Sequence, residues 1–329
     1  MFNIKTGSLF IAFVCLAFAP FHICSDNEPS MKQAPPYEQA PPPEGLEGVG
    51  LRRWLADRAL VYHHHYFKYS KYPDLENPTT FTEKIHYRML YDRRPILTLF
   101  ADKIRVRDYV AERVGEKYLT KICQITQNPE EIDWKSLPGR YFLKTNHGSS
   151  MNIFVEWNTI AYVPQYIESV QGILRRWLHT DYSNFCGEWC YREIPQRFVY
   201  VEEYLGKGEE RPTDWKFHVF DGKVYCFMVQ KDRRCNFYDR NLNLLNVRQL
   251  QENFSDPMMF PDNMEEMFSV AERLAEGIDY VRVDLYNIDG LVVFGELTNY
   301  PHAGLVPFDP PEFDRELGDQ WRLECLRAD

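Results

Sequence analysis

Two carboxylates near the end of the sequence stand at a spacing that suits a divalent cation. Asp284 follows Arg282 on one apolar run, and Glu296 lies on a second apolar run beyond the turn-like residues 287–290. If the two runs are neighbouring strands of a hairpin, the carboxylates of Asp284 and Glu296 come level with each other. Side-chain oxygens at that separation are the ligands that Mg²⁺ prefers, and Mg²⁺ bridges phosphates. The alternative is a cross-strand pair of acids whose repulsion is relieved by Arg282.

A lysine followed by small residues predicts a place for phosphate oxygens. Lys144 ends another apolar run, and the loop after it contains Gly148, Ser149 and Ser150. Backbone N–H groups and hydroxyls of such a loop can surround phosphate oxygens, while the lysine adds positive charge. The order is not that of a Walker A loop, in which the glycines precede the lysine. Taken alone, the segment also suits an ordinary strand and turn.

Three shorter segments place further charged residues beside apolar ones. Asp102 and Lys103 stand in a predicted helix, and Asp214 comes just before a predicted strand. Glu202 and Glu203 end a third apolar run. Carboxylates at such a strand end can hydrogen-bond the amino group of an adenine, or they can simply face the solvent.

The elements that must position these residues read as helices first and hairpins afterwards. Apolar residues at helical spacing predict helices over 46–69 and 96–114, the second ending at Gly115. Thr80 and Glu83 form a capping-box pattern, so another helix is expected to begin near Thr80.

The second half of the sequence favours strands. Strands are predicted at 140–145, 152–157, 198–205, 215–220, 223–230, 280–286 and 291–298, with one helix at 263–276. Asp221-Gly222 is a strong signal for a two-residue hairpin turn. Helices combined with antiparallel hairpins, without regular alternation of strand and helix, indicate an α+β fold.

Composition excludes several classes of protein. Apolar residues make up 44% of the 329 residues, which is enough for a substantial core and argues against wholesale disorder. The net charge of −10 argues against a general nucleic-acid binder, so no nucleic-acid partner is expected. A mean hydropathy of −0.47 excludes a polytopic membrane protein. Among the eight cysteines, Cys186 and Cys190 form the close pair of the body, with no second pair at zinc-ligand spacing, and disulfides are expected only in an oxidising lumen.

The N-terminal residues read as a targeting segment followed by a stem. Lys5 precedes an uncharged apolar run over 9–19, so residues 1–24 suit a cleaved secretory signal or a membrane anchor. A secretory lumen or a membrane-anchored location is therefore expected, with a cytoplasmic protein as the alternative. Residues 25–45 are rich in proline and are interpreted as a semi-rigid linker. A helical region at 46–135 and a catalytic domain at 136–329 are expected to follow.

Taken in order, the segments resemble the ATP-grasp superfamily, and more closely its TupA-like branch for teichuronopeptide biosynthesis, sometimes labelled glycosyltransferase-like. The resemblance runs from about Asn77 to Gly318. Its motifs are Phe81–Ile85, Asp102-Lys103 with Arg107, Leu143–Ser149, Glu202–Leu205, Asp214–Phe217, Arg282–Tyr286 and Phe294–Thr298. The resemblance implies two antiparallel-sheet subdomains that clasp a nucleotide cleft, with a helical N-terminal part.

The same resemblance implies how ATP is held. Lys103 and Lys144 match the lysines that hold ATP phosphates, and the loop after Lys144 matches the one that closes over them. The residues implied in nucleotide binding are Lys103, Lys144, Gly148, Ser149, Ser150, Glu202, Glu203, Leu205 and Asp214. In this resemblance Asp214 lies near the ribose, whereas Glu202, Glu203 and Leu205 contact the adenine.

In this resemblance, residues of the final hairpin bind the metal and the transferred phosphoryl group. Asp284 and Glu296 match the Mg²⁺ carboxylates, and Arg282 matches an arginine near the transferred phosphoryl group, with Lys144 as its catalytic companion. The usual third ligand is an asparagine two residues after the glutamate. Here Thr298 holds that place and Asn299 follows it, so both stay candidates. Because two like charges oppose each other, exchanging Asp284 for asparagine is expected to cost little stability.

The function implied is an ATP- and Mg²⁺-dependent ligase. ATP would phosphorylate a carboxylate to an acylphosphate, which an amine then attacks, on a small-molecule or glycan substrate of polysaccharide modification. The alternatives are a glycosyltransferase that uses a metal-bound nucleotide-sugar, an ATP-dependent kinase and a non-catalytic binding relative.

Overall fold

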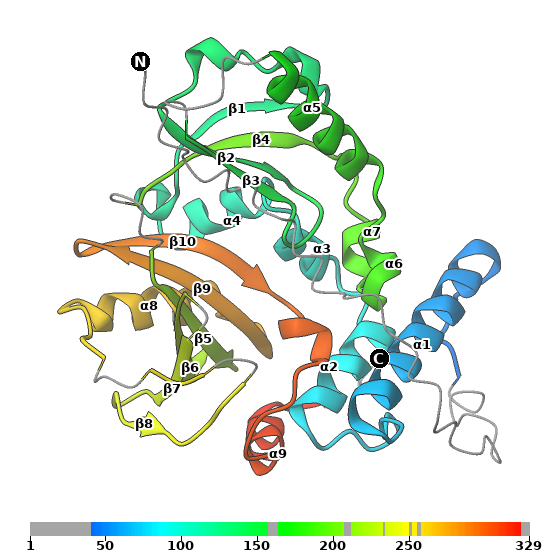
Figure 1. Ribbon diagram of the computed structural model, residues 1–329. Coiled ribbons are helices and arrows are strands. Elements are labelled where there is room, and N and C mark those ends of the chain that lie inside the picture. The colour runs from blue at the N-terminus through cyan, green and yellow to red at the C-terminus, as the bar shows by residue number, and fades with distance from the viewer. Residues whose placement is uncertain are drawn as a thin grey trace, which may run out of the picture.

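Two antiparallel sheets, with helices on and between them, form the part of the chain that the computed structural model describes (Figure 1). That part comprises residues 41–156, 164–206, 212–232, 234–249, 252–254 and 258–323. The predicted targeting segment at 1–24 and residues 25–40 of the stem lie outside it. Among the described residues, no helix is both long enough and apolar enough to cross a membrane.

The first helices begin much where the sequence predicts. α1 spans Gly48–Tyr69, and α2 spans Phe81–Tyr91. The predicted capping box is confirmed, because the Thr80 hydroxyl accepts the backbone N–H of Glu83 at 3.2 Å and the Glu83 carboxylate accepts that of Thr80 at 3.1 Å. Two backbone donors that have no partner within the helix are thereby satisfied.

The single helix predicted over 96–114 is wrong, because two helices stand in its place. α3 spans Pro95–Ala101 and α4 spans Val106–Arg113. Asp102 lies between them with an extended backbone, and its carboxylate accepts backbone N–H groups two and three residues further along. An aspartate that bonds the backbone in this way competes with the helical hydrogen bonds and breaks the helix.

The first sheet has the order β1-β4-β2-β3, all antiparallel. Its strands are β1 (Ile122–Thr126), β2 (Arg140–Thr145), β3 (Asn152–Glu156) and β4 (Val199–Glu203). Helix α5 (Pro164–His179) packs on it through Leu174 and Trp177, which share a buried cluster with Tyr141 and Leu143. The sequence patterns missed β1 and α5. β1 lies in the stretch predicted to be helical.

The second sheet has the order β10-β9-β5-β6-β7-β8. Its strands are β5 (Asp214–Phe220), β6 (Lys223–Lys231), β7 (Arg234–Asp239), β8 (Leu244–Leu245), β9 (Tyr280–Ile288) and β10 (Leu291–Thr298), and α8 (Met264–Leu274) packs on one face. The turn at Asp221-Gly222 is confirmed, with both φ angles positive, at 45° and 74°. The last hairpin turns at Asp289-Gly290, so β9 runs on to Ile288, beyond its predicted end, whereas β10 has the predicted bounds.

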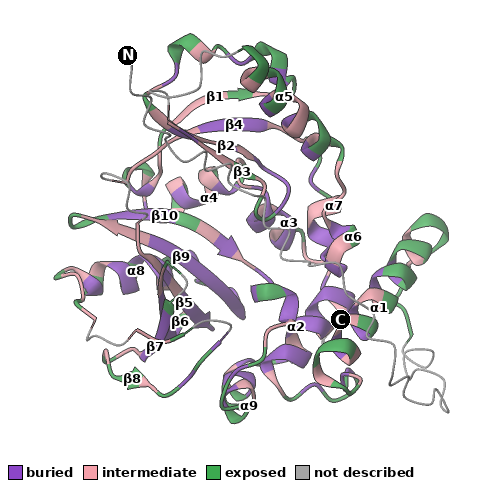
Figure 2. Cartoon of the chain, in the orientation of Figure 1, coloured by how far each residue is buried: buried purple, intermediate pink, exposed green. Residues whose placement is uncertain are grey.

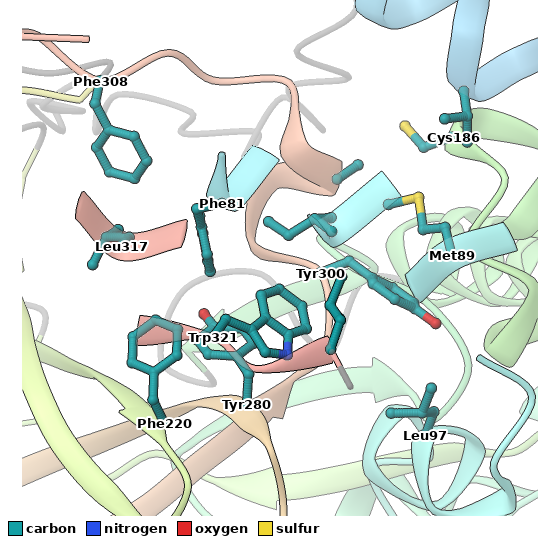
Figure 3. Packing of buried hydrophobic residues seen from close by; sticks show 14 of the residues in the cluster. Phe81, Met89, Leu97, Cys186, Phe220, Tyr280, Tyr300, Phe308, Leu317 and Trp321 are labelled. Carbon is teal, nitrogen blue, oxygen red and sulfur yellow. The ribbon is translucent and has the colours of Figure 1, made fainter. Parts of the chain in front are cut away.

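A large buried cluster joins the N-terminal helices to the second sheet (Figures 2 and 3). Phe81 of α2, Tyr280 of β9 and Trp321 pack ring against ring, with centroids 4.7 to 5.8 Å apart. The buried guanidinium of Arg88 donates to the Asp279 carboxylate at 2.6 Å. The remaining elements are α6 (Ser183–Cys186), α7 (Trp189–Arg192), α9 (Glu312–Gln320) and the short 3-10 helices η2 (Glu116–Tyr118), η3 (Pro129–Glu131), η4 (Trp134–Ser136) and η5 (Pro301–Gly304). Five cysteines lie in the described part, and all are free thiols.

Candidate active site

The break between α3 and α4 places Lys103 beside the loop that follows β2. The backbone N–H of Lys103 donates to the carbonyl of Asn146 at 3.1 Å, and its ammonium donates to the carbonyl of Gly148. Asp102 accepts the side-chain amide of Asn146 at 3.0 Å. A lysine in an unbroken helix would have no such tie, so the helix break brings Lys103 to the predicted phosphate loop.

Lys144 and Glu202 form an ion pair on the first sheet. Their side chains meet at 2.5 Å, and the other carboxylate oxygen of Glu202 accepts the Thr120 hydroxyl at 2.5 Å. Glu203 pairs with Tyr141 in the β2–β4 ladder, and Leu205 lies half-buried just beyond β4. Lys144 and the end of β4 therefore lie on the first sheet, and Lys103 is hydrogen-bonded to the loop that follows β2.

The small residues of the loop have a steric reason. A Cβ on Gly148 would lie 2.7 Å from the sulfur of Met151 and 3.3 Å from the ring of Tyr182, so a larger residue there requires the Met151 side chain to move. Ser149 and Ser150 are exposed, and Ser150 has a left-handed backbone with φ of 59°. The loop thus offers two accessible hydroxyls next to the carbonyl that Lys103 holds.

The carboxylate end of the site lies on the final hairpin of the second sheet. Glu296 of β10 is the register partner of Asp284 of β9, just after a bulge at Gly295. A Cβ on Gly295 would come within 2.9 Å of the Asp284 carbonyl, so glycine permits the bulge. The two carboxylates are therefore level with each other across the hairpin.

Arg282 binds both carboxylates. Its guanidinium donates twice to Asp284, at 2.7 Å each, and once to Glu296 at 3.3 Å. Lys216 of β5, the register partner of Asp284 on the other side, adds a 2.9 Å ion pair. Although burial opposes its ionisation, these two cations hold the pKa of Asp284 below its usual value. Asp284 is thus an ionised carboxylate between two cations.

Asp214 and Glu296 differ from Asp284 in their surroundings. Burial raises the pKa of Asp214, and Lys216 opposes the shift from a distance of 3.9 Å. The side chain of Glu296 is 41% exposed, and among the described residues only its Oε1 atom is hydrogen-bonded. Glu296 therefore has a free oxygen to offer to a cation.

The structure separates the two candidates for the third metal ligand. The Thr298 hydroxyl donates to Glu296 at 3.0 Å and accepts Arg282 at 3.0 Å. The amide of Asn299 is buried and donates to the carbonyl of Leu97 at 2.8 Å. Successive side chains of a strand point to opposite faces, so Thr298 lies with the carboxylates and Asn299 faces α3.

The donor set suits a hard cation that also takes ligands from elsewhere. Within the described residues, no three His, Cys, Asp or Glu side chains converge on one point. Asp284, Glu296 and Thr298 supply two carboxylates and a hydroxyl, all of them oxygen donors. Mg²⁺ prefers such oxygens and keeps positions for phosphates and water, so the residues present fit Mg²⁺ bound together with a phosphate group.

Electrostatics connect the two sheets at Lys103. Burial lowers the pKa of Lys103, the carboxylate of Glu296 opposes this shift, and the ammonium of Lys144 adds to it. α3 contacts β10 directly, and it lies near the first sheet in Figure 1. Positive charge on the first sheet therefore faces negative charge on the second, with Lys103 between them.

Lys216 and Glu188 also belong to this region, although the sequence patterns did not assign them to it. Lys216 lies two residues after Asp214 on β5, so the alternation of side chains along a strand places both residues on the same face of the sheet. Glu188 lies between α6 and α7, and burial raises its pKa to about 8, with Lys103 opposing and Glu296 adding to the shift. No local pattern distinguishes Glu188 from a surface glutamate.

The loop after β10 has an unusual backbone. His302 and Ala303 are both left-handed, with φ of 51° and 53°. The ring of His86 holds the Ala303 carbonyl at 3.1 Å, and the Tyr69 hydroxyl donates to Gly304 at 3.1 Å. Backbone strain of this kind persists only where the surroundings enforce it.

Two cavities lie away from these residues. One of 540 Å³ is bordered by Asn128, Arg175 and Arg197, and one of 620 Å³ by Gly172, Arg176 and Thr180. Neither shares a residue with the site described above. We place the site by its charges and hydrogen bonds, because enclosed volume alone does not identify chemistry.

Lys144 on the first sheet, Lys103 between α3 and α4, and two carboxylates on the second sheet form a donor set that suits a metal-bound polyphosphate. The chain belongs to the TupA-like ATP-grasp family, whose model matches residues 83–322. The predicted family and the predicted α+β ATP-grasp fold are therefore confirmed. No curated protein matches the sequence.

Solved structures of ATP-grasp proteins are distantly similar to the chain. D-alanine–D-alanine ligase from Bacillus anthracis, complexed with ATP, is 14% identical at a TM-score of 0.37, over 62% of this chain and 57% of that one. The ATP-grasp ligase PsnB, complexed with minimal precursor, Mg and ADP, is 13% identical at 0.34, over 62% and 52%. N5-carboxyaminoimidazole synthase from Aspergillus clavatus is 12% identical at 0.37, over 62% and 45%. The chain thus spans about half of the length of these proteins.

Proposed function

We propose that the protein is an ATP- and Mg²⁺-dependent ligase that joins a carboxylate to an amine through an acylphosphate. Membership of the ATP-grasp family supports the class of reaction. The observation that carries the proposal is the position of Lys103, within electrostatic reach of both Lys144 on the first sheet and Glu296 on the second. A nucleotide phosphate between the sheets would meet cations on one side and a metal site on the other.

The residues of the chain divide the work in this scheme. Lys103, Lys144 and the loop of Gly148 to Ser150 neutralise and orient the phosphates of ATP. Asp284, Glu296 and Thr298 hold Mg²⁺, which supplies charge neutralisation for the transferred phosphoryl group. Arg282 is anchored by Asp284 and reaches Glu296, so it stabilises the negative charge that develops during transfer.

The proposed reaction has two steps. A substrate carboxylate oxygen bonds to the γ-phosphorus of ATP, and the bond to ADP breaks. An amine nitrogen then bonds to the carbon of the acylphosphate, and inorganic phosphate leaves with the electron pair of the broken carbon–oxygen bond. None of these steps needs a covalent nucleophile from the protein, so positioning and charge neutralisation are its main contribution.

We also propose a carboxylated sugar or amino acid as donor, an amine-bearing small molecule or glycan as acceptor, and a role in polysaccharide modification. The resemblance to the teichuronopeptide branch supports this substrate class. The N-terminal apolar run supports entry into a secretory route, or attachment to a membrane, and a fluorescent fusion of the full chain would locate it.

The decisive experiment measures nucleotide binding and turnover with the full chain. Thermal shift with AMPPNP and Mg²⁺ should raise the unfolding midpoint, whereas a UDP-sugar should not. Release of ADP should then require a carboxylate from a panel of uronic and amino acids, and amide formation should require an amine. Lys103→Met should weaken AMPPNP binding by roughly tenfold, which corresponds to about 1.4 kcal/mol. The exposed Lys117, changed in the same way, is the matched control.

Other outcomes point elsewhere. Binding of a UDP-sugar in preference to AMPPNP would favour a glycosyltransferase. Phosphate transfer to an acceptor without amide formation would indicate a kinase, and no nucleotide binding at all would indicate a non-catalytic relative.

A further inference from the structure

Glu188 is a buried carboxylate without a protein partner. It is 8% exposed. Although it precedes α7 at the N-cap position, its side chain accepts no backbone N–H of that helix. Among the described residues, none forms a hydrogen bond or an ion pair with its carboxylate. The oxygens of Glu188 are not among the fully enclosed, unpartnered polar atoms of the described residues, so this carboxylate is open to a ligand.

The groups around Glu188 belong to the candidate active site. The charges that act on it come from Lys103 and Glu296, one from each side of the site. Burial, together with the negative charge of Glu188, raises the pKa of four neighbouring groups, those of Tyr182, Tyr191, Cys186 and Cys190. α7 contacts α3, the helix that leads into Lys103. Glu188 therefore lies beside the residues proposed to hold the phosphates and the metal.

Two tyrosines lie beside Lys103 and the phosphate loop. The rings of Tyr182 and Tyr191 lie 4.9 Å apart, and the ring of Tyr191 lies 5.7 Å from the ammonium of Lys103. Tyr182 also borders the phosphate loop at Gly148. Aromatic rings and a carboxylate in the same site form a favourable environment for an organic ammonium group, through ion pairing and cation–π attraction.

We propose that Glu188 binds the ammonium group of the acceptor and accepts the proton that frees its lone pair for attack. This inference rests on the proposed ligase function. The acceptor R–NH₃⁺ gives one proton to the Glu188 carboxylate, and the nitrogen lone pair forms the bond to the acyl carbon. The carbon–oxygen bond to phosphate then breaks, and the second N–H proton leaves with the phosphate as HPO₄²⁻. The products are the amide, the hydrogen phosphate and neutral Glu188, so atoms and charge balance.

The chemistry of the surroundings suits this role. Burial raises the pKa of Glu188 to about 8, which Glu296 reinforces and Lys103 opposes. A base with a pKa in that range can take a proton from an alkylammonium group far more readily than an ordinary glutamate can.

The binding test uses methylammonium as a minimal acceptor. The unfolding midpoint of the full chain with saturating AMPPNP and Mg²⁺ is measured at pH 9 in methylammonium chloride and in sodium chloride of equal ionic strength. Wild type should show a concentration-dependent rise specific to methylammonium. Glu188→Gln should lose it, and Glu188→Asp should keep part of it. Glu193→Gln, which removes an exposed carboxylate five residues away, should behave as wild type.

Two results would overturn the assignment: no methylammonium-specific rise in wild type, or an equal rise in Glu188→Gln. The AMPPNP shift separates this outcome from failure of the proposed function. If AMPPNP stabilises every variant and methylammonium does not distinguish them, the ATP site stands and the role of Glu188 falls. If AMPPNP does not stabilise wild type, the ligase function falls, whatever methylammonium does.

A kinetic test uses the donor carboxylate found in the turnover assay. Hydroxylamine is already neutral at pH 7.5, so it can trap the acylphosphate without a base to free its lone pair. Glu188→Gln should lower amide formation with the amine by roughly a hundredfold or more, the usual scale of general-base catalysis, and keep hydroxamate formation within a few-fold of wild type. Equal losses with both nucleophiles would show that Glu188 serves the first step or the fold instead.

Discussion

Asp102 and Asn146 are joined by a 3.0 Å hydrogen bond that ties the helical segment of Lys103 to the loop after Lys144. The carbonyl of the same asparagine accepts the backbone N–H of Lys103 at 3.1 Å. Two residues that lie 44 positions apart in the sequence thus set the distance between the two lysines of the candidate site. The helix break at Asp102 is therefore part of the site and not an irregularity of the fold.

Asp102→Ala should lower both stability and nucleotide affinity. The substitution leaves two backbone N–H groups and the amide of Asn146 without their acceptor, which should cost about 2 kcal/mol or more. Lys103 loses its anchor, so AMPPNP affinity should fall by roughly tenfold. Urea unfolding and calorimetric titration measure the two effects, and the exposed Asp108→Ala is the control. Unchanged affinity in a folded Asp102→Ala protein would show that Lys103 needs no such tie.

Asp284→Asn should be costly, contrary to the expectation from sequence. Charge repulsion with Glu296 suggested a small effect, but Asp284 lies between Arg282 and Lys216, and the substitution leaves these two cations with a weaker partner. We expect a loss of about 3 kcal/mol in the free energy of unfolding. The Mg²⁺-dependent part of AMPPNP binding should also disappear. Binding and unfolding are compared with the exposed Asp319→Asn; full retention of Mg²⁺-dependent binding would contradict the metal assignment.

A buried histidine pair should make the protein sensitive to acid. The rings of His65 and His86 meet at 3.1 Å, and His86 holds the carbonyl of Ala303. Because a carbonyl only accepts, Nε2 of His86 carries its proton, and its Nδ1 atom accepts from His65. Burial lowers the pKa of His86 to about 4 and that of His65 to about 3.

Stability from these histidines is present above their unfolded pKa of about 6.5 and is lost as the pH falls toward 4. The free energy of unfolding should change with pH by up to about 1.4 kcal/mol per pH unit for each histidine. Urea unfolding at pH 7 and pH 5 tests this, with His86→Phe expected to reduce the slope and the exposed His63→Ala to leave it unchanged. Equal slopes in all three proteins would remove the histidines as the cause.

Glu188 should act in the opposite direction at alkaline pH. Burial raises its folded-state pKa to about 8, above the ordinary 4.5, so the folded state binds the proton more tightly than the unfolded state. Stability should therefore fall as the pH rises between 4.5 and 8, and level off above that range. Glu188→Gln should flatten this part of the profile and be the more stable protein at pH 8.5, whereas Glu193→Gln should follow wild type. A profile of Glu188→Gln that parallels wild type would speak against a buried titrating carboxyl.

Local patterns in the sequence predicted much of the second sheet and its hairpins. Asp284 and Glu296 lie on two apolar runs separated by the turn-like residues 287–290, so one short stretch of chain contains both partners of the pair. The capping box of Thr80 and Glu83 is equally local. Hydrogen bonds and side-chain alternation repeat over short spans, so a linear pattern is sufficient to reveal them.

Tertiary structure decided what the patterns could not. The uniform helical spacing over 96–114 carried no sign that Asp102 would turn its carboxylate on its own backbone, since its partner Asn146 comes much later. Strand β1 needed β4 as its partner, and β4 lies more than seventy residues away. Glu188 and Lys103 approach each other only because α7 packs on α3.

The sequence by itself determined the residues that carry charge and the hairpin that aligns two carboxylates, because side-chain alternation is a property of each strand. The tertiary structure decided the partners: Lys216 and Arg282 for Asp284, Lys144 for Glu202, and Thr298 in place of Asn299 beside Glu296. Charges and burial act through space, so these partners depend on packing between distant segments, which no local pattern records.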